Sequence, residues 1–285
     1  MGLCVIGRQG QVATALAEAA AARGTPLAVL ARPEIDLAAP HTIAPALDHL
    51  APSVVVNAAA YTAVDQAESE PALAHTINAE SPHAMAAWCA ARGARFIHLS
   101  TDYVFDGNGT RPYREDDPVA PKSAYGRTKL AGEAAVAAAG GHSLIVRTAW
   151  VYAPFGKNFV RTMLRLGAER DSVSVVSDQH GTPTSALDIA DALLALAARP
   201  DWGSAPEVFH LAGQGETTWH SFAHEIFRRA SLTPAVQAIP TSHYPTPAAR
   251  PRYSVLDCGK LFERFGIVLP PWRDSLATVV DRLTR

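Results

Sequence analysis

Cysteine is scarce in this chain, and neither sign of charge is in strong excess. The three cysteines, Cys4, Cys89 and Cys258, are far apart and outside metal-ligand spacing, so we expect neither a disulfide framework nor a zinc site. A formal net charge of −2 leaves no polybasic segment, so we expect no nucleic acid and no membrane surface as a partner. Any anionic ligand must therefore be met by local arginines.

Long apolar runs are also missing. No uninterrupted apolar stretch reaches the length that spans a bilayer, and the N-terminus enters the strand-like run 3–6 without the features of a signal peptide. A cytoplasmic protein with reduced thiols is therefore expected. With 285 residues, 48% of them hydrophobic, the chain can bury a large core as one two-lobed unit or as two domains.

The first half of the chain alternates short aliphatic runs with alanine-rich stretches. This pattern is typical of βαβ units and predicts a doubly wound parallel sheet of the α/β class. The predicted strands are 3–7, 27–31, 53–58, 95–100 and 143–148. The predicted helices between them are 11–23, 41–50, 71–92 and 123–139. Beyond residue 150 the prolines and glycines indicate a smaller, loop-rich lobe with a strand at 172–177 and helices near 158–170, 219–230 and 272–283.

A glycine turn follows the first predicted strand. Gly7 permits a tight turn, Gly10, Gln11 and Val12 precede a helix, and Ala13 takes the last small position. A strand, such a turn and a helix together place a dinucleotide pyrophosphate on a helix N-terminus. Glycine turns also join strands to helices for steric reasons alone, but the position directly after the first strand favours a dinucleotide site.

The second and third predicted strands supply further cofactor-binding candidates. An acidic residue at the end of the second strand selects a free ribose 2′-hydroxyl, whereas arginine accommodates a 2′-phosphate. Arg32 stands there, which favours NADPH over NADH, although it also fits a solvated surface charge. Asp36 and Leu37 are candidates for contacting the adenine. The small residues Ala58, Ala59 and Ala60 leave room for a flat ligand.

The sequence also places a tyrosine and a lysine four residues apart. On a helix, Tyr125 and Lys129 would share one face, with Cβ atoms about 5–6 Å apart. A phenol titrates near pH ~10, so we expect the Lys129 ammonium to lower the Tyr125 pKa. Thr101, at the end of a predicted strand, offers a hydroxyl to the oxygen that is protonated. Such a pair alone is more often an ordinary surface pair; with Thr101 and the glycine turn it predicts hydride chemistry.

Longer segments carry a family resemblance. The glycine turn, Thr101, Tyr125 and Lys129 resemble the extended short-chain dehydrogenase/reductase superfamily. Further segments resemble, within it, the dTDP-4-dehydrorhamnose reductase family: 57–68 (NAAAYTAVDQAE), 100–107 (STDYVFDG), 125–133 (YGRTKLAGE), 147–152 (RTAWVY), 158–164 (NFVRTML), 178–184 (DQHGTPT) and 244–251 (YPTPAARP).

The resemblance implies a fold, a reaction and a set of residues. It implies a Rossmann-type domain at 1–150 with a returning segment near 172–215, and a mainly sugar-nucleotide-binding α+β lobe at 151–285. The implied reaction is reduction of the C4 ketone of dTDP-4-dehydro-6-deoxy-L-mannose to dTDP-L-rhamnose with NADPH or NADH. Tyr125 is the implied proton donor, Lys129 binds the nicotinamide ribose, and Thr101 orients the ketone oxygen. Thr101, Asp102 and Trp150 are implied to face the substrate.

Three points stay open at this stage. For the substrate pyrophosphate, Arg250 in the second lobe is our hypothesis. Trp150, taken by itself, also fits a core position. Some family members bind magnesium through glutamates at a dimer interface, but Ala15 occupies one such place, so we expect no metal here; the sequence allows a homodimer.

Two other functions remain as alternatives. Another sugar-nucleotide enzyme of the superfamily, an epimerase or dehydratase, is one; a dehydratase usually has two acidic residues after the threonine, whereas here Tyr103 follows Asp102. A non-catalytic NADP-binding regulatory subunit is the other, and the intact Tyr125 and Lys129 argue against it.

Overall fold

The short aliphatic runs of the first half form one parallel sheet. The computed structural model describes residues 2–285, and within these residues six strands pair in the order β10-β5-β4-β3-β1-β2. All pairs in this sheet are parallel. The strands are β1 (Leu3–Ile6), β2 (Leu27–Leu30), β3 (Val54–Asn57), β4 (Arg95–Thr101), β5 (Ser143–Thr148) and β10 (Glu207–His210). The carboxyl ends of these strands therefore meet at one edge, where parallel α/β sheets bind ligands.

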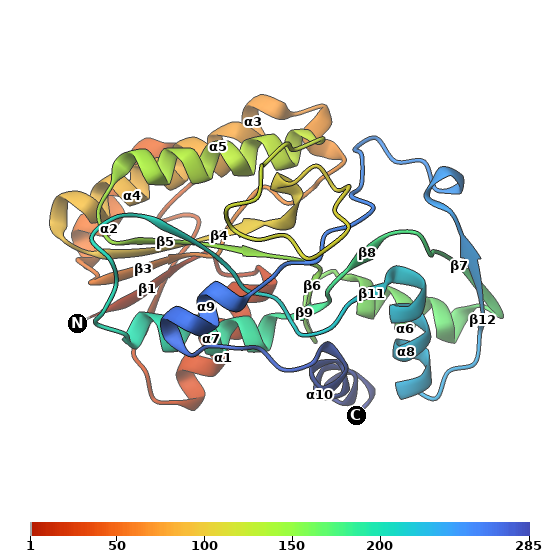
Figure 1. The fold of residues 1–285 in the computed structure, drawn as a ribbon. Helices are drawn as coiled ribbons and strands as arrows, with labels where there is room; N and C mark the ends of the chain where they lie inside the picture. Colours follow the sequence, from red (N-terminus) through yellow and green to blue (C-terminus); the bar gives the residue numbers. More distant parts are fainter. Residues whose placement is uncertain (1) are drawn as a thin grey trace.

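Alternate residues of each strand point to opposite faces of the sheet, and each face is covered by helices (Figure 1). Val5 joins one buried cluster, whereas Cys4 and Ile6 join the other. The first cluster is closed by α1 (Gln11–Ala22) and α7 (Ala186–Ala198), and the second by α2 (Ile43–Leu50), α4 (Ser81–Arg92) and α5 (Ala124–Ala139). The sheet is thus buried on both faces, which explains its almost uninterrupted aliphatic strands.

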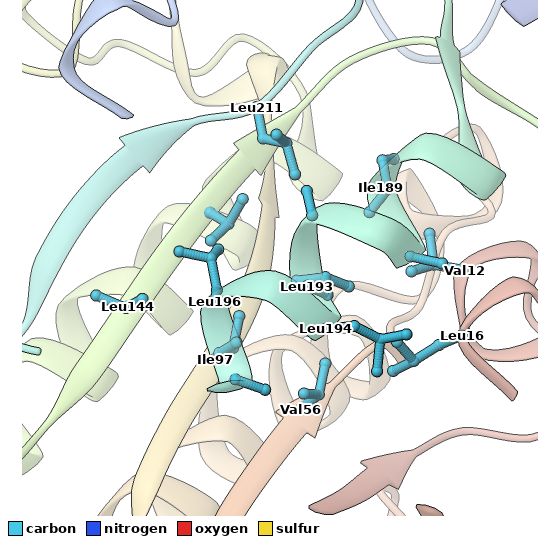
Figure 2. Close-up of a cluster of buried hydrophobic side chains, with 14 of the residues drawn as sticks. Val12, Leu16, Val56, Ile97, Leu144, Ile189, Leu193, Leu194, Leu196 and Leu211 are labelled. Atoms are coloured by element: carbon cyan, nitrogen blue, oxygen red, sulfur yellow. The ribbon is translucent and has the colours of Figure 1, made fainter. Parts of the chain in front are cut away.

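Figure 2 shows the larger of these two clusters. Leu193 and Leu196 of α7 lie over Val56, Ile97 and Leu144 of the sheet, and all of them are buried. Leu194 meets Val12 and Leu16 of α1 on the other side of the same helix. Helix α7 is apolar on several sides because it is enclosed between the sheet and α1.

A second group of elements forms a smaller lobe beside the carboxyl edge of the sheet (Figure 1). Its core is aromatic and aliphatic, with Phe222, Trp272 and Leu276 fully buried. Its elements are β7 (Ser172–Val176), β12 (Ala235–Ile239), α6 (Phe159–Glu169), α8 (Trp219–Arg229) and α10 (Trp272–Thr284). Short strand pairs join β6 (Val151–Tyr152) to β9 (Thr184–Ser185) and β8 (His180–Gly181) to β11 (Thr217–Thr218).

The expected elements are found within a few residues of their predicted bounds, and the structure adds elements that the sequence did not predict, among them strand β12. The predicted helix 71–92 is α3 (Pro71–His75) and α4, separated by a π-helical turn over Thr76–Glu80. Helix α7 and strand β10 lie in the stretch interpreted as loop-rich; both pack on the large sheet, and both fall within the returning segment near 172–215 that the resemblance implies. Helix α9 (Gly259–Phe265) was also not expected. None of the helices within residues 2–285 is both long and apolar enough to cross a membrane.

Candidate active site

The glycine turn lies at the centre of the carboxyl edge. Gly7 has a φ of +115°, and a Cβ on it would lie 3.3 Å from the Cβ of Ala59. Gly10 precedes α1, where no side chain caps the helix, so its first N–H groups stay available to a ligand. The backbone here fits a dinucleotide pyrophosphate: side chains are absent where the ligand must approach, and N–H donors point toward it.

A cleft of about 1160 Å³ runs from this turn to the smaller lobe. With Arg250 as the exception, every residue that the sequence predicts for the site lines this cleft. They are Gly7, Gly10, Gln11, Val12, Arg32, Asp36, Leu37, Ala58, Ala59, Ala60, Thr101, Asp102, Tyr125, Lys129 and Trp150. The volume is large enough for two ligands side by side, since sites for single drug-sized molecules measure roughly 300–1,000 Å³.

The start of α5 places Tyr125 beside Thr101. Ser123 caps the helix by accepting a hydrogen bond from the Gly126 N–H at 3.1 Å, which sets Tyr125 in the first turn. A Cβ on Gly126 would lie 2.3 Å from the carbonyl oxygen of Tyr103, so glycine allows α5 to approach the end of β4. The rings of Tyr125 and Tyr103 meet edge to face at 5.6 Å.

Burial raises the pKa of Tyr125 to about 12, although a hydrogen bond with the Thr101 hydroxyl acts in the opposite direction. Lys129 is not among the groups that shift the Tyr125 pKa; its Nζ donates to the Leu99 carbonyl oxygen at 2.6 Å. Burial lowers the pKa of Lys129 itself to about 8. The prediction that Lys129 lowers the Tyr125 pKa is therefore wrong for this structure. The phenol keeps its proton at neutral pH, as a proton donor must.

Two buried polar atoms at the cleft have no hydrogen-bond partner among residues 2–285. They are Oδ2 of Asp102 and Oγ1 of Thr148. The other carboxylate oxygen of Asp102 accepts from the Thr101 hydroxyl at 2.9 Å, and burial raises the pKa of Asp102 to about 6. Buried polar groups are nearly always paired, so Asp102 and Thr148 are candidates for binding polar groups of a ligand. The sequence did not single out Thr148.

Trp150 borders the cleft rather than filling the core. Its ring stacks on that of Trp219 at a centroid distance of 3.5 Å and an interplanar angle of 6°. A Cβ on Gly181 would lie 2.4 Å from Cε2 of Trp150, so glycine leaves room for the indole. Trp219 comes from the smaller lobe and also lines the cleft; no local motif had singled it out.

The structure does not bring Arg250 into the lining of the cleft. Its guanidinium forms an ion pair with Asp65, with Nη2 and Oδ2 2.7 Å apart. Arg8 and Lys157 are cations of the lining that the sequence analysis did not select. Arg8 lies inside the glycine turn, and this position could have identified it from the sequence. Lys157 lies in the loop between β6 and α6, where no sequence motif pointed to it.

Metal-ligating clusters are not found in the part of the chain that the structure describes. No group of three or more His, Cys, Asp or Glu side chains within residues 2–285 is arranged to hold a metal ion. His220 and His224 lie at adjacent turns of α8, with ring centroids 4.7 Å apart, and Ala15 is buried in the core.

Comparison with known proteins assigns the family. The sequence profile of the RmlD substrate binding domain matches residues 1–285. The chain belongs to the RmlD family. It is 47% identical to a dTDP-4-dehydrorhamnose reductase of Burkholderia thailandensis, over 99% of each chain. Among solved structures, it is similar to a dTDP-4-dehydrorhamnose reductase of Clostridium acetobutylicum, with a TM-score of 0.95, 38% identity and 100% of each chain covered. A dTDP-4-dehydrorhamnose reductase of Bacillus anthracis, solved in complex with NADP, is similar with a TM-score of 0.92 and 33% identity over 98% of each chain.

Proposed function

We propose that the chain is an NADPH-dependent oxidoreductase that reduces the C4 ketone of dTDP-4-dehydro-6-deoxy-L-mannose to dTDP-L-rhamnose. The observation that carries this proposal is one cleft that contains the glycine turn at one end and Thr101, Tyr125 and Lys129 beside it. The curated relatives named for this activity, over nearly their full length, support the choice of substrate.

Tyr125 supplies the proton of the reaction. When bound, the reduced nicotinamide supplies hydride to the C4 carbon of the ketone. The Tyr125 phenol donates its proton to the oxygen at C4, where negative charge develops. The Tyr103 N–H holds Oγ1 of Thr101 in place. The hydroxyl proton, which Thr101 donates to Asp102 in the free protein, turns to the oxygen at C4 and helps to stabilise its charge.

The other cleft residues bind and orient. The turn from Gly7 to Val12 holds the cofactor pyrophosphate, and Lys129 holds the nicotinamide ribose. Asp102 and Thr148 form hydrogen bonds with hydroxyl groups of the sugar, and the ring of Trp150 covers the substrate. Arg250 is bound to Asp65, so Lys157 is the better candidate for an anionic group of either ligand. A homodimer and a cytoplasmic location remain predictions.

The proposal is tested by mixing the purified protein with enzymatically prepared dTDP-4-dehydrorhamnose and NADPH. We expect substrate-dependent loss of the absorbance of the reduced nicotinamide and formation of dTDP-L-rhamnose. A protein that binds NADPH but oxidises neither NADPH nor NADH in the presence of this substrate would contradict the proposed enzymatic activity. That result would favour a regulatory role.

Arg32 is expected to set the preference for NADPH. It is exposed and lines the cleft beside Asp36 and Leu37, where an arginine accommodates a 2′-phosphate. Arg32→Ala should weaken NADPH binding by about 1–2 kcal/mol, as expected for a charge-assisted contact, and leave NADH binding nearly unchanged. Titration calorimetry with both cofactors measures this. Arg23→Ala, which removes a surface pair with Asp191, is the matched control; equal losses for NADPH and NADH would contradict the role of Arg32.

A further inference from the structure

The backbone of Trp150 is held in an uncommon conformation. Trp150 lies between β5 and β6 and has a φ of +47°, in the left-handed region that bulky side chains rarely adopt. Its carbonyl oxygen accepts a hydrogen bond from the Thr184 N–H at 3.2 Å. Such a conformation persists only where surrounding contacts hold it, so the contacts of the indole are the next question.

Both faces of the Trp150 indole contact the smaller lobe. Trp219 covers one face almost completely, with ring centroids 3.5 Å apart and an interplanar angle of 6°. A Cβ on Gly181 would lie 2.4 Å from Cε2 and 2.6 Å from both Cζ2 and Nε1 of Trp150, so Gly181 lies over a face of the ring and not at its edge. Because Trp219 fills the first face, Gly181 lies on the opposite one. We call the space between Gly181 and Trp219 the Trp150 slot.

One short strand pair builds both walls of the Trp150 slot. Gly181 in β8 is the register partner of Thr217 in β11. Thr218 then caps α8 by accepting a hydrogen bond from the Ser221 N–H at 3.2 Å, which makes Trp219 the first residue of that helix. A strand pair and a helix cap therefore set the distance between the two walls.

Trp219 is itself held by protein contacts. The ring of Phe159, at the start of α6, packs on Trp219 with a centroid distance of 4.6 Å. Two isolated aromatic rings prefer an offset or edge-to-face arrangement. The close overlap of Trp150 and Trp219 therefore depends on the residues around the two rings, which keep Trp219 in place as a wall.

We propose that Trp219 is a positioning residue, which together with Gly181 fixes the indole of Trp150 at the cleft. The inference rests on the proposed function, because it takes Trp150 as a residue that contacts the sugar nucleotide. A side chain that is ordered in the free protein need not be ordered when the ligand binds, so its ordering cost does not reduce the affinity. The Trp150 slot also joins the two lobes, since Trp150 follows β5 of the large sheet and both walls belong to the smaller lobe.

The indole N–H groups report directly on the order of Trp150. The protein contains five tryptophans, Trp88, Trp150, Trp202, Trp219 and Trp272, so ¹⁵N-labelled protein without ligand should give five indole signals. That of Trp150 is identified by its loss in Trp150→Phe. We expect Trp219→Ala to lower the ¹H–¹⁵N NOE of the Trp150 indole, which measures motion on the ps–ns timescale. The signals of Trp88 and Trp202, whose N–H groups donate to protein oxygens outside the cleft, should not change.

The kinetic effect should fall on the binding of the sugar nucleotide. We expect Trp219→Ala to raise KM for dTDP-4-dehydrorhamnose by roughly three- to tenfold, the range for ordering one side chain on binding. kcat and the affinity for NADPH should change little, because Trp150 contacts substrate and transition state alike. Trp219→Phe keeps an aromatic wall and should restore most of the affinity. His220→Ala, at the next position of α8 and outside the lining of the cleft, is the matched control.

A second variant acts from the other wall. Gly181→Ala places a Cβ where the indole lies, so it should displace the ring from the Trp150 slot, lower its NOE and raise KM as Trp219→Ala does. Together the two variants change opposite walls and should give the same result. Unchanged Trp88 and Trp202 signals show that a variant is folded.

Trp219 also lines the cleft, so a direct contact with the substrate is the alternative to a positioning role. The double variant Trp150→Ala/Trp219→Ala separates the two. If Trp219 acts through Trp150, the KM of the double variant should equal that of Trp150→Ala alone. Losses that multiply would overturn the positioning role. So would an ordered Trp150 with an unchanged KM in whichever of Trp219→Ala and Gly181→Ala folds.

The outcomes also distinguish the Trp150 slot from the proposed function. An active reductase with either of these contrary results would refute the slot and leave the proposed function intact. In a protein that binds dTDP-L-rhamnose but does not reduce the ketone, the dissociation constant of this product replaces KM. The expected changes would then support the slot and refute the reductase. A protein that neither binds nor converts the sugar nucleotide would refute both proposals.

Discussion

Tyr125→Phe is expected to lower kcat of ketone reduction by roughly 10²–10⁴-fold, the range that a positioned general acid contributes. The change removes one oxygen and keeps the ring that packs against Tyr103. NADPH affinity should therefore change little, and the loss should fall on kcat because the proton is transferred in the transition state. Steady-state kinetics together with titration of NADPH binding measures both quantities.

The matched control for this change is Tyr152→Phe. Tyr152 is buried in the smaller lobe, and its hydroxyl makes one long hydrogen bond of 3.4 Å to the Trp272 carbonyl oxygen. A kcat of Tyr125→Phe within a few-fold of wild type, or an equal loss in both variants, would show that another group is the acid.

The same account sets the pH dependence of Tyr125. A general acid must be protonated, so its contribution is lost as the pH rises through its pKa. Burial raises that pKa to about 12, so ionisation of Tyr125 in the free protein should not lower kcat/KM at any pH at which the protein is ordinarily assayed.

Glu133→Ala is expected to destabilise the fold by about 3–5 kcal/mol, the cost of leaving one charge of a buried pair without its partner. Both carboxylate oxygens of Glu133 bind Arg147, at 2.9 and 2.7 Å. The Ser100 hydroxyl donates to the same carboxylate at 2.5 Å. Both charged side chains are about 5% exposed. The variant leaves the guanidinium of Arg147, in β5, buried without its carboxylate partner, and urea unfolding measures the loss of stability.

Glu169→Ala is the control for a surface ion pair. Glu169 pairs with Arg165 one turn away on α6, and both side chains are more than half exposed, so its loss should cost less than about 1 kcal/mol. Replacing Glu133 by Leu and Arg147 by Met together should restore part of the stability, since no buried charge then remains. Equal unfolding free energies for Glu133→Ala and Glu169→Ala would contradict a buried, energetically coupled pair.

Local patterns made much of the site predictable. Gly7, Gly10 and Gln11 follow one strand directly, and Tyr125 and Lys129 share one helix, so their spacing alone brings them together. Strands rich in valine and isoleucine, with short turns between them and the helices, made the succession of strands and helices along the first half of the chain predictable.

What escaped prediction depends on contacts between distant segments. The partner of Arg250 is Asp65, 185 residues away, and no local pattern joins them. Trp219 and Lys157 reach the cleft from the smaller lobe. Helix α7 was not recognised because its exposed positions are Asp191 and two alanines, Ala195 and Ala198, so its polar residues produce only a weak helical periodicity.

The protonation states were the least predictable part of the site. Residue spacing placed Lys129 near Tyr125, but the register of β3 and β4 sets His98 and the Leu99 carbonyl oxygen at its amine. Burial then raises the Tyr125 pKa rather than lowering it. The direction of a pKa shift follows from the surrounding fold, which residue spacing does not contain.

The most direct test of the central claim follows the transferred hydride itself. NADPH carrying deuterium at the nicotinamide C4 is incubated with the protein and dTDP-4-dehydrorhamnose, and the product is analysed by NMR. We predict dTDP-L-rhamnose with deuterium bound at C4 of the sugar when one of the two labelled stereoisomers of NADPH is used. A product without deuterium at C4 from either stereoisomer, or no product, would contradict the account.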